Sequence, residues 1–248
     1  MSTLSQITAT DYELFPSPKR IRVLLGGRVI ADTRRALLLR REKGPPVYYF
    51  PLADLQQDVL QESGRAAAPA GCGEAQFYTV HVDGSERPDA AWRLTRPAPG
   101  LAGLGGHVAF DWNAMDGWFE EEQEVFVHPR DPRKRIDITP SSAHVRVLLE
   151  GETVAESHRP TLLFETGLAT RYYLPRLDVR QELLQPSERV TRCPYKGEAR
   201  YYSLRLGETL LEDVLWHYRY TTLEASPIAG LLCFYQERIV VEVDGRAL

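Results

Sequence analysis

The residues best suited to chemistry lie in the second half of the sequence. Lys196 stands between Tyr195 and Gly197, where a lysine can clamp an anion and the glycine lets backbone amides approach the bound group. Aromatic walls with a few charged groups are what a small-molecule pocket requires. The residues expected to line such a pocket are Arg159, Glu165, Tyr172, Tyr173, Tyr195, Lys196, Tyr202 and Trp216.

The same residues also fit a structural role. Tyrosines that alternate along strands commonly pack a core, and an arginine and a glutamate commonly pair with each other. Lys196 would then be a turn residue in solvent, whereas a desolvated Lys196 could act as a nucleophile. The sequence leaves these alternatives open.

A thiol and two carboxylates offer further chemistry, each with a structural alternative. Cys193 with His217 or His158 would make a thiol–imidazole pair, although a cysteine near an apolar run is usually a small core residue. Glu242 and Asp244 alternate along the expected last strand, so they would share one face. Two carboxylates on one face suit a two-metal transfer site, and they also suit a strand that faces solvent.

Neither a metal site nor a phosphate-binding loop is predicted. His107 has no second histidine or carboxylate at ligand spacing, so we interpret it as structural. Leu101–Gly106 is rich in glycine, but no helical pattern and no lysine follow it, as a phosphate loop requires. No cofactor is therefore expected.

A tandem duplication must position these residues. Tyr48 and Tyr49 match Tyr172 and Tyr173 at an offset of 124 positions, and other residues match at the same offset without a gap. The first-unit residues that we group with this site are Arg35, Tyr48, Tyr49, Tyr78, Trp92 and His107. We expect an N-terminal arm over residues 1–19, a first unit over 20–128, a linker over 129–142 and a second unit over 143–248.

The signals within each unit are mainly those of β-strands. Runs rich in aromatic and β-branched residues, such as Val47–Phe50, alternate with Gly, Pro and Asp. One short helix is expected after each Tyr-Tyr strand, because Asp54 with Gln57 and Asp178 with Gln181 fit a capping box. We therefore predict a mainly β protein of two small antiparallel units, each with one short helix.

The first unit has a segment, residues 111–122, that we interpret as an addition before its last strand at Glu124–Val127. Two fused units must bury a shared face, so we expect the aromatic patch of this segment at the interface between them. The alternatives are contact with a partner protein or a cover over the first unit's pocket. The patch consists of Trp112, Met115, Trp118 and Phe119.

Composition and charge argue against several classes of protein. A net charge of −4 and a pI near 5.9 are unlike the basic face of a nucleic-acid binder. The three cysteines are too few and too scattered for a disulfide framework. The first 20 residues lack the pattern of a signal peptide, and no stretch approaches the apolar run of about 18 residues of a membrane span. We expect a cytoplasmic protein, monomeric or homodimeric.

With the repeat and its motifs in place, the sequence resembles the bacterial domain-of-unknown-function family 427 in tandem form. The resemblance covers roughly residues 20–248 and is most specific at Glu124–Pro132, Leu162–Pro175 and Thr191–Ala199. It implies a small, mostly antiparallel fold with a bent sheet, the β-tent shape shared with methionine sulfoxide reductase B and the cereblon ligand-binding domain. Those relatives often hold a structural zinc on paired cysteines. This sequence has no such cysteine pairs, so the resemblance does not imply a zinc here. The family also has a nucleotidyltransferase label, for which the sequence shows no convincing motif, and no established activity comes with it.

Three functions follow as hypotheses. The first is binding of a small organic ligand in an aromatic-lined pocket of the second unit. The second is an enzyme of the transferase or nucleotidyltransferase type that uses Lys196, Glu165 or Tyr195 as polar catalytic groups. The third is a protein-interaction module. Because Cys72 takes the place of Lys196 in the first unit, we expect the working site in the second unit.

Overall fold

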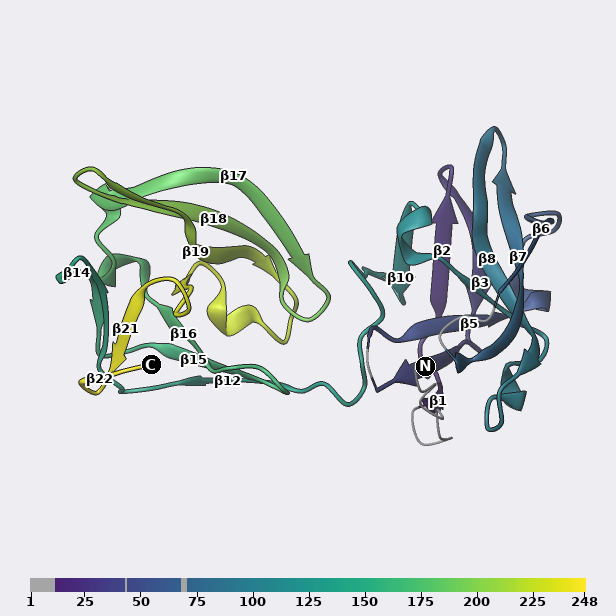
Figure 1. Cartoon of the computed structure of the whole chain (residues 1–248), viewed down its shortest axis with the longest axis horizontal. Coiled ribbons are helices and arrows are strands. Elements are labelled where there is room, and N and C mark those ends of the chain that lie inside the picture. Colours follow the sequence, from purple (N-terminus) through teal and green to yellow (C-terminus); the bar gives the residue numbers. More distant parts are fainter. Residues whose placement is uncertain (1–11, 43, 68–70) are drawn as a thin grey trace, which may run out of the picture. The chain divides into compact units, whose positions relative to one another are not determined.

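The chain folds into two compact units, Met1–Asp131 and Pro132–Leu248. The computed structural model describes residues 12–42, 44–67 and 71–248, and the statements below concern these residues. In Figure 1 the first unit runs from purple to teal and the second from teal through green to yellow. Within the described residues, no helix has the length and apolar character needed to cross a membrane.

The first unit consists of two antiparallel sheets. Its strands are β1 (Tyr12–Pro16), β2 (Ile21–Leu25), β3 (Arg28–Thr33), β4 (Leu37–Arg41), β5 (Val47–Pro51), β6 (Leu60–Ala67), β7 (Gly73–Val82), β8 (Ser85–Pro97), β9 (His107–Phe110), β10 (Gly117–Glu120) and β11 (Gln123–Glu124). The seven-stranded sheet has the order β1-β4-β5-β9-β8-β7-β6, and the four-stranded sheet has the order β11-β10-β2-β3.

The second unit repeats this arrangement. Its strands are β12 (Ile136–Pro140), β13 (Val145–Leu149), β14 (Glu152–Ser157), β15 (Thr161–Glu165), β16 (Arg171–Leu174), β17 (Leu184–Cys193), β18 (Gly197–Leu206), β19 (Thr209–Thr221), β20 (Leu232–Phe234), β21 (Val240–Val243) and β22 (Arg246–Ala247). The sheets have the orders β12-β15-β16-β20-β19-β18-β17 and β14-β13-β21-β22. The predicted mainly β class and the tandem duplication are confirmed.

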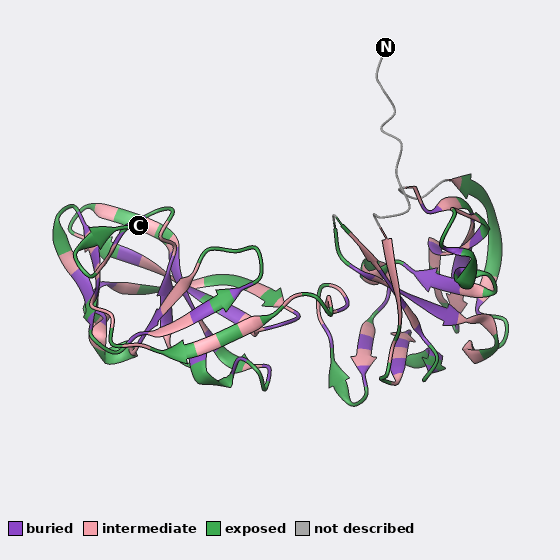
Figure 2. Cartoon of the chain, turned by 90° about the horizontal axis from the view of Figure 1, so that it is seen from below, coloured by how far each residue is buried: buried purple, intermediate pink, exposed green. Residues whose placement is uncertain are grey.

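Alternation along the strands divides the apolar side chains of each unit between two clusters. In β5, Phe50 packs into a core shared by both sheets, whereas Tyr49 points to the opposite face of the seven-stranded sheet. In β16, Leu174 likewise packs into the core between the sheets, and Tyr173 points to the opposite face. Successive side chains of a strand point to opposite faces, so this division follows from the pleat. Figure 2 shows buried and exposed residues following one another along the strands.

A short 3-10 turn, η7 (Ser226–Ile228), covers the second of these clusters in the second unit. Figure 1 shows the turn between strands β17–β19 and strands β12, β15 and β16, and Ile228 is fully buried there. We call this group the turn cluster. Its buried members are Leu163, Tyr173, Ala199, Tyr201, Trp216, Tyr218, Ala225, Ile228 and Cys233.

The short helix expected after each Tyr-Tyr strand is a 3-10 turn, and the helix capped by Asp54 or Asp178 does not form. After the Tyr-Tyr strand the chain forms only three-residue 3-10 turns, which are η1 (Leu52–Asp54), η5 (Arg176–Asp178) and η6 (Gln181–Leu183). Neither aspartate caps a helix. Leu55 and Val179 instead form β-bridges with Ala31 and Ala155, and this pairing draws the chain out of the helical conformation that the local pattern favoured.

The arm and the linker expected from the sequence both contain an edge strand. Strand β1 pairs with β4, and β12 pairs with β15 in the equivalent place of the second unit. Residues 12–16 and 136–140 are 124 positions apart, so the duplication extends beyond the boundaries that we expected.

Residues 111–122 are not an addition to the first unit. Strand β10 lies within them and pairs with β2, with Phe119 opposite Arg22. In the second unit β21 pairs with β13 in the same way, with Glu242 opposite Arg146. The two closing strands are therefore equivalent, and the expected strand at Glu124–Val127 is reduced to the end of β11.

The aromatic patch of this segment belongs to the first unit's own core, which overturns its interpretation as an interface. Trp118 is 4% exposed and Met115 is 8% exposed, and both pack into the core between the two sheets. Trp112 stacks on Trp118 with ring centroids 4.3 Å apart. Phe119 lies under the guanidinium of Arg22. Because β10 is an inner strand, alternation turns Trp118 inward.

Candidate functional site

The second unit holds a buried carboxylate between two lysines. Glu165, at the end of β15, is 7% exposed, and it contacts the ammonium group of Lys196. The Nζ of Lys134 lies 3.0 Å from its other oxygen. The Lys196 side chain is only 13% exposed, and lysines are rarely so buried. We call Lys134, Glu165 and Lys196 the charged triad.

The backbone around Lys196 is tied in place by hydrogen bonds. Thr222 N donates to the carbonyl of Lys196 at 3.2 Å, and the Thr222 hydroxyl donates to the carbonyl of Tyr195 at 2.7 Å. Gly197 follows with a φ of 109°, a conformation that side chains with a Cβ rarely adopt. The turn therefore holds Lys196 against Glu165.

Burial and the two lysines act on Glu165 in opposite directions. Burial raises the pKa of the carboxyl group, but the hydrogen bonds and charges of Lys196 and Lys134 outweigh it, so the pKa lies below its usual value of 4.5. Glu165 is therefore ionised at neutral pH, and the triad carries one net positive charge.

The triad and the turn cluster lie on the same face of the seven-stranded sheet. Leu163 and Glu165 are two positions apart on β15, so their side chains point to one side, and Leu163 belongs to the turn cluster. Burial raises the pKa of Tyr218 in that cluster, and the charge of Glu165 is among the groups that add to this rise. The carboxylate and the rings thus belong to one site.

Four aromatic rings form a connected group on this face. Trp216 Nε1 donates to the Tyr173 hydroxyl at 3.3 Å, with the two rings edge to face. The centroids of Trp216 and Tyr235 are 4.5 Å apart, and Tyr235 stacks in parallel with Tyr201. Tyr173 and Trp216 are 1% and 7% exposed, whereas Tyr235 is half-buried. Tyr235 therefore links the buried rings to the surface.

Cations lie over three rings of this face. Arg171 lies over Trp216 at 5.6 Å from the ring centroid, and Arg189 lies over Tyr201 at 4.6 Å. Lys134 of the triad lies over Tyr195 at 5.6 Å. Each distance is within the range of a cation–π interaction. These cations also pair with carboxylates, which are Glu237 for Arg171, Asp213 for Arg189 and Glu165 for Lys134, so the aromatic face is bordered by ion pairs.

Two tyrosines expected in the same pocket lie elsewhere. Tyr172 and Tyr202 pack against the core between the two sheets, on the face opposite Tyr173. Arg176 donates to the Tyr202 hydroxyl at 3.1 Å, and the ring of Tyr202 stacks on His217. A strand with a period of two cannot direct neighbouring tyrosines into one pocket, so the prediction that all of them line it is wrong.

Arg159 also lies outside this site. Its guanidinium pairs with Asp178 at 2.9 Å, and its side chain is 68% exposed. Asp178 accepts a second hydrogen bond, of 2.7 Å, from the hydroxyl of the buried Ser157. The hydrogen bond of Arg159, with burial opposing it, lowers the pKa of Asp178. The same brace joins Arg35 to Asp54 in the first unit.

We expect the Asp178→Asn substitution to destabilise the second unit by about 1–2 kcal/mol, because the Ser157 hydroxyl loses a charged acceptor. Urea denaturation of the full chain, followed by hydrogen exchange of second-unit peptides, measures this change. Asp54→Asn is the matched control, and its effect should appear in first-unit peptides. Equal destabilisation of both units by either variant would contradict the expectation.

The first unit keeps the aromatic pair but not the triad. Trp92 Nε1 donates to Tyr49 at 3.2 Å, as Trp216 does to Tyr173. Burial raises the pKa of Tyr49 to about 12, and the hydrogen bond from Trp92 opposes that rise. Arg41 and Cys72 occupy the positions of Glu165 and Lys196, so the ion pair is absent at that place.

The other first-unit residues that we grouped with the site have different surroundings. The Tyr48 hydroxyl donates to the buried carboxylate of Glu120 at 2.9 Å, in the core between the sheets. Tyr78 belongs to that core as well and borders an open cleft of about 630 Å³. His107 Nδ1 lies 3.2 Å from the carbonyl oxygen of Gly105.

The remaining candidates do not assemble as the sequence suggested. Asp244 lies beyond the end of β21 with a φ of 49°, and Glu242 pairs with Arg146, so the two carboxylates do not share a strand face. His217 stacks on Tyr202, and His158 stacks on His144. Cys193 pairs with Gly197 and His217 pairs with Arg200, so they lie several rungs apart in the seven-stranded sheet, and His158 lies next to the four-stranded sheet.

Two open clefts of the second unit lie away from the triad. One, of about 690 Å³, is lined by residues 153–156 and 177–182. The other, of about 430 Å³, is lined largely by residues 148–150 and 236–241.

Sequence reasoning missed several members of this site. Lys134 lay in the expected linker, and Arg171 and Tyr235 were not among the residues expected to line the pocket. One signal was available, because lysine occurs only four times in the sequence and two of those lysines form the triad. A second missed group, His144 with Glu156 and His158, gathers on the four-stranded sheet.

Comparison with known families agrees with the duplication. The family model described as "Domain of unknown function (DUF427)" matches the chain twice, over residues 13–121 and 137–245. The two matches fall in the two compact units. No curated protein matches the chain.

Proposed function

The chain belongs, in two tandem copies, to the family described as "Domain of unknown function (DUF427)", and because that description names no activity we propose a function from the second unit itself. The second unit binds a small organic ligand that carries an acidic group. The charged triad holds the acid, and the neighbouring aromatic face holds the body of the ligand.

The burial of the charged triad is the observation that carries this proposal. Taking charges out of water is costly, and well-packed apolar side chains of similar volume often stabilise a protein better than a buried ion pair does. The position of Lys196 in the first unit is occupied by Cys72, so the fold itself does not require a lysine there. A function that uses the charges explains why the second unit has them.

The charge balance of the triad favours an anion. Two ammonium groups face one carboxylate, and each ammonium has three donors. A carboxylate or phosphate of the ligand would complete the neutralisation with charge-assisted hydrogen bonds. Pockets of this kind combine apolar walls with a small number of convergent polar groups.

Native mass spectrometry of the freshly purified protein, compared with its denatured mass, is the first test. A retained ligand appears as an adduct that disappears on denaturation, and its mass identifies the compound class. Calorimetric titration with benzoate and with inorganic phosphate then separates an aromatic carboxylate from a bare anion. We expect benzoate to bind more tightly, because phosphate cannot use the aromatic face.

Lys196→Gln is expected to weaken benzoate binding by about tenfold or more, the effect of losing one charge-assisted hydrogen bond. Lys19→Gln is the matched control, since Lys19 contacts the buried Glu120 of the first unit as Lys196 contacts Glu165. The proposal fails if neither an adduct nor benzoate binding is found, or if both variants bind like the wild type.

The enzymatic alternative uses the same residues. An ion pair with a carboxylate stabilises a charged ammonium, whereas a lysine nucleophile must react as a neutral amine. Lys196 in contact with Glu165 is therefore better suited to holding an anion than to attacking a substrate. Once a ligand is identified, its recovery unchanged after prolonged incubation with the protein distinguishes binding from turnover.

A further inference from the structure

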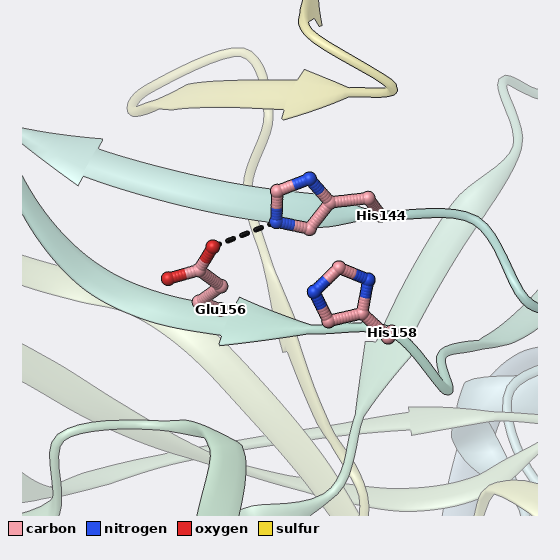
Figure 3. A group of neighbouring side chains, drawn as sticks. All are labelled: His144, Glu156 and His158. Carbon is pink, nitrogen blue, oxygen red and sulfur yellow. Dashed lines mark hydrogen bonds and ion pairs between the residues drawn. The ribbon is translucent and has the colours of Figure 1, made fainter.

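A second group of chemically competent side chains lies on the four-stranded sheet of the second unit. Figure 3 shows His144, Glu156 and His158 close together at the edge of the hairpin that β13 and β14 form. Each offers one ligand atom, and these atoms lie within 4.8 Å of one another. His144 Nε2 is 2.7 Å from a carboxylate oxygen of Glu156, and the two imidazole rings stack with centroids 4.1 Å apart.

The hairpin register brings these residues together. Val145 pairs with Ser157, so His144 and His158 occupy the next rung of the ladder. Glu156 lies on β14 and His158 directly follows its last residue, Ser157, so the alternation of the strand continued by one residue places both side chains on one face. Three residues spread over 15 positions of sequence thus become neighbours through strand pairing.

Neighbouring carboxylates hold the backbone of His144 and the side chains on either side of His158. Asp244 accepts a hydrogen bond of 2.9 Å from the backbone N–H of His144 and donates its own N–H to the carbonyl of His144. Asp178 accepts from Ser157 and Arg159, the residues on either side of His158. The two ligand positions are therefore anchored, while the side chains remain accessible to solvent, with His144 at 33% and Glu156 at 49% exposure.

We propose that His144, Glu156 and His158 bind a divalent transition-metal ion, with Zn²⁺ as the natural probe. Two imidazole nitrogens and a carboxylate oxygen are ligands that Zn²⁺ accepts, and they leave a fourth tetrahedral position to water. Ligand atoms around tetrahedral zinc are about 3.3 Å apart, given bonds of about 2.0–2.1 Å. The three ligand atoms now lie within 4.8 Å of one another, so they draw together around the ion, which replaces the His144–Glu156 hydrogen bond.

Metal binding requires one ring to move. A single ion cannot lie in the planes of two parallel stacked rings, so one imidazole must turn about its side-chain torsions to direct a nitrogen at the metal. His158 is exposed and at the end of its strand, and its ring can turn without displacing a core residue. The site is thus open in the absence of metal and closes around the ion.

The first unit provides an internal contrast. The equivalent positions are Arg20, Asp32 and Arg34, and Arg20 forms a two-point pair with Asp32. A guanidinium has no acceptor and does not ligate a metal. The same place on the two sheets therefore holds a fixed cation–carboxylate pair in one unit and metal-competent imidazoles in the other.

Calorimetric titration of the full chain with Zn²⁺ at pH 7.5 tests the proposal. We expect one equivalent to bind with a Kd on the order of 10 µM or tighter. The double variant His144→Arg/His158→Arg, which copies the first unit and keeps a cation beside Glu156, should weaken binding at least tenfold. In the wild type, the ¹⁵N resonances of the His144 and His158 rings should shift together on titration.

Two further variants test which side chains bind the ion. Cys193→Ser should leave the affinity unchanged, because the proposed ligands include no thiol. Glu156→Gln should weaken binding while its amide still fills the same space. The proposal is overturned if the wild type binds no Zn²⁺ at 100 µM-scale concentrations, if the double arginine variant binds like the wild type, or if Cys193→Ser abolishes binding.

Discussion

Replacing Glu165 by glutamine is expected to destabilise the second unit by about 3–5 kcal/mol, the cost of leaving a buried charge without its partner. Lys196 would keep an ammonium group that is 13% exposed and has lost its carboxylate, and Lys134 would lose the same acceptor. Urea denaturation of the full chain, with hydrogen exchange resolved by unit, measures the change. First-unit peptides should keep their wild-type protection.

The double variant Glu165→Leu/Lys196→Met is the control for this interpretation. Removing both partners of a buried pair, and filling the space with apolar groups, is often neutral or stabilising. Lys134 also loses Glu165, but its side chain is 30% exposed and keeps access to water. We therefore expect the double variant to recover most of the stability that Glu165→Gln loses, while it loses benzoate binding. A Glu165→Gln variant that loses less than about 1 kcal/mol would show that the pair is solvated.

The contribution of Glu165 should also depend on pH. Its folded-state pKa lies below the usual 4.5, so the carboxyl group binds its proton less readily in the folded state than in the unfolded state. The stabilisation is therefore fully present above pH 4.5 and is lost as the pH falls through the lower folded-state pKa. The stability difference between wild type and Glu165→Gln should shrink in that acidic window and be constant near neutrality.

Gly197→Ala is expected to destabilise the second unit by about 3–5 kcal/mol, at the upper end of single substitutions. An added Cβ would lie 2.4 Å from the carbonyl oxygen of Tyr220, on the paired strand β19, and Gly197 has a φ of 109°. A backbone atom in a sheet cannot move aside as a flexible side chain can. Thermal unfolding with hydrogen exchange resolved by unit provides the measurement.

The first unit contains the equivalent glycine. Gly73→Ala would place a Cβ 2.1 Å from the carbonyl oxygen of Arg96, so a similar loss is expected there. Gly207→Ala is the control, because Gly207 also has a positive φ but no atom lies within 4 Å of its added Cβ. That variant should lose only about 1–2 kcal/mol, from the backbone conformation alone. Equal losses at Gly197 and Gly207 would show that the close approach to Tyr220 is relieved.

The sequence by itself determined the duplication and the type of structure. The matches at an offset of 124, from Tyr48 and Tyr172 onward, need only the order of residues, and the structure has two units of the same topology. The positions of many strands could also be predicted, because runs of aromatic and β-branched residues between turn residues are a local signal. The prominence of Lys196 and Glu165 likewise came from residue type and from the contrast between the units.

Local signals failed where pairing between distant strands competed with them. The aspartates at 54 and 178 fit a helix cap, yet β-bridges from Leu55 and Val179 hold the chain extended. The two carboxylates instead accept hydrogen bonds from Thr33, Ser157 and two arginines. The patch of residues 112–119 was interpreted as an interface, because the sequence around it does not reveal that its strand pairs with β2 inside the sheet.

Only the tertiary structure decided which side chains share a site. Tyr172 and Tyr173 are adjacent in sequence and lie on opposite faces, whereas Lys134, Glu165 and Lys196 are far apart and meet. His144 and His158 become neighbours through the register of one hairpin. Residue type sets what chemistry a side chain can perform, but strand pairing, register and the pleat set which partners it has. Those depend on contacts between segments that are distant in sequence, and the local patterns of the sequence do not reveal such contacts.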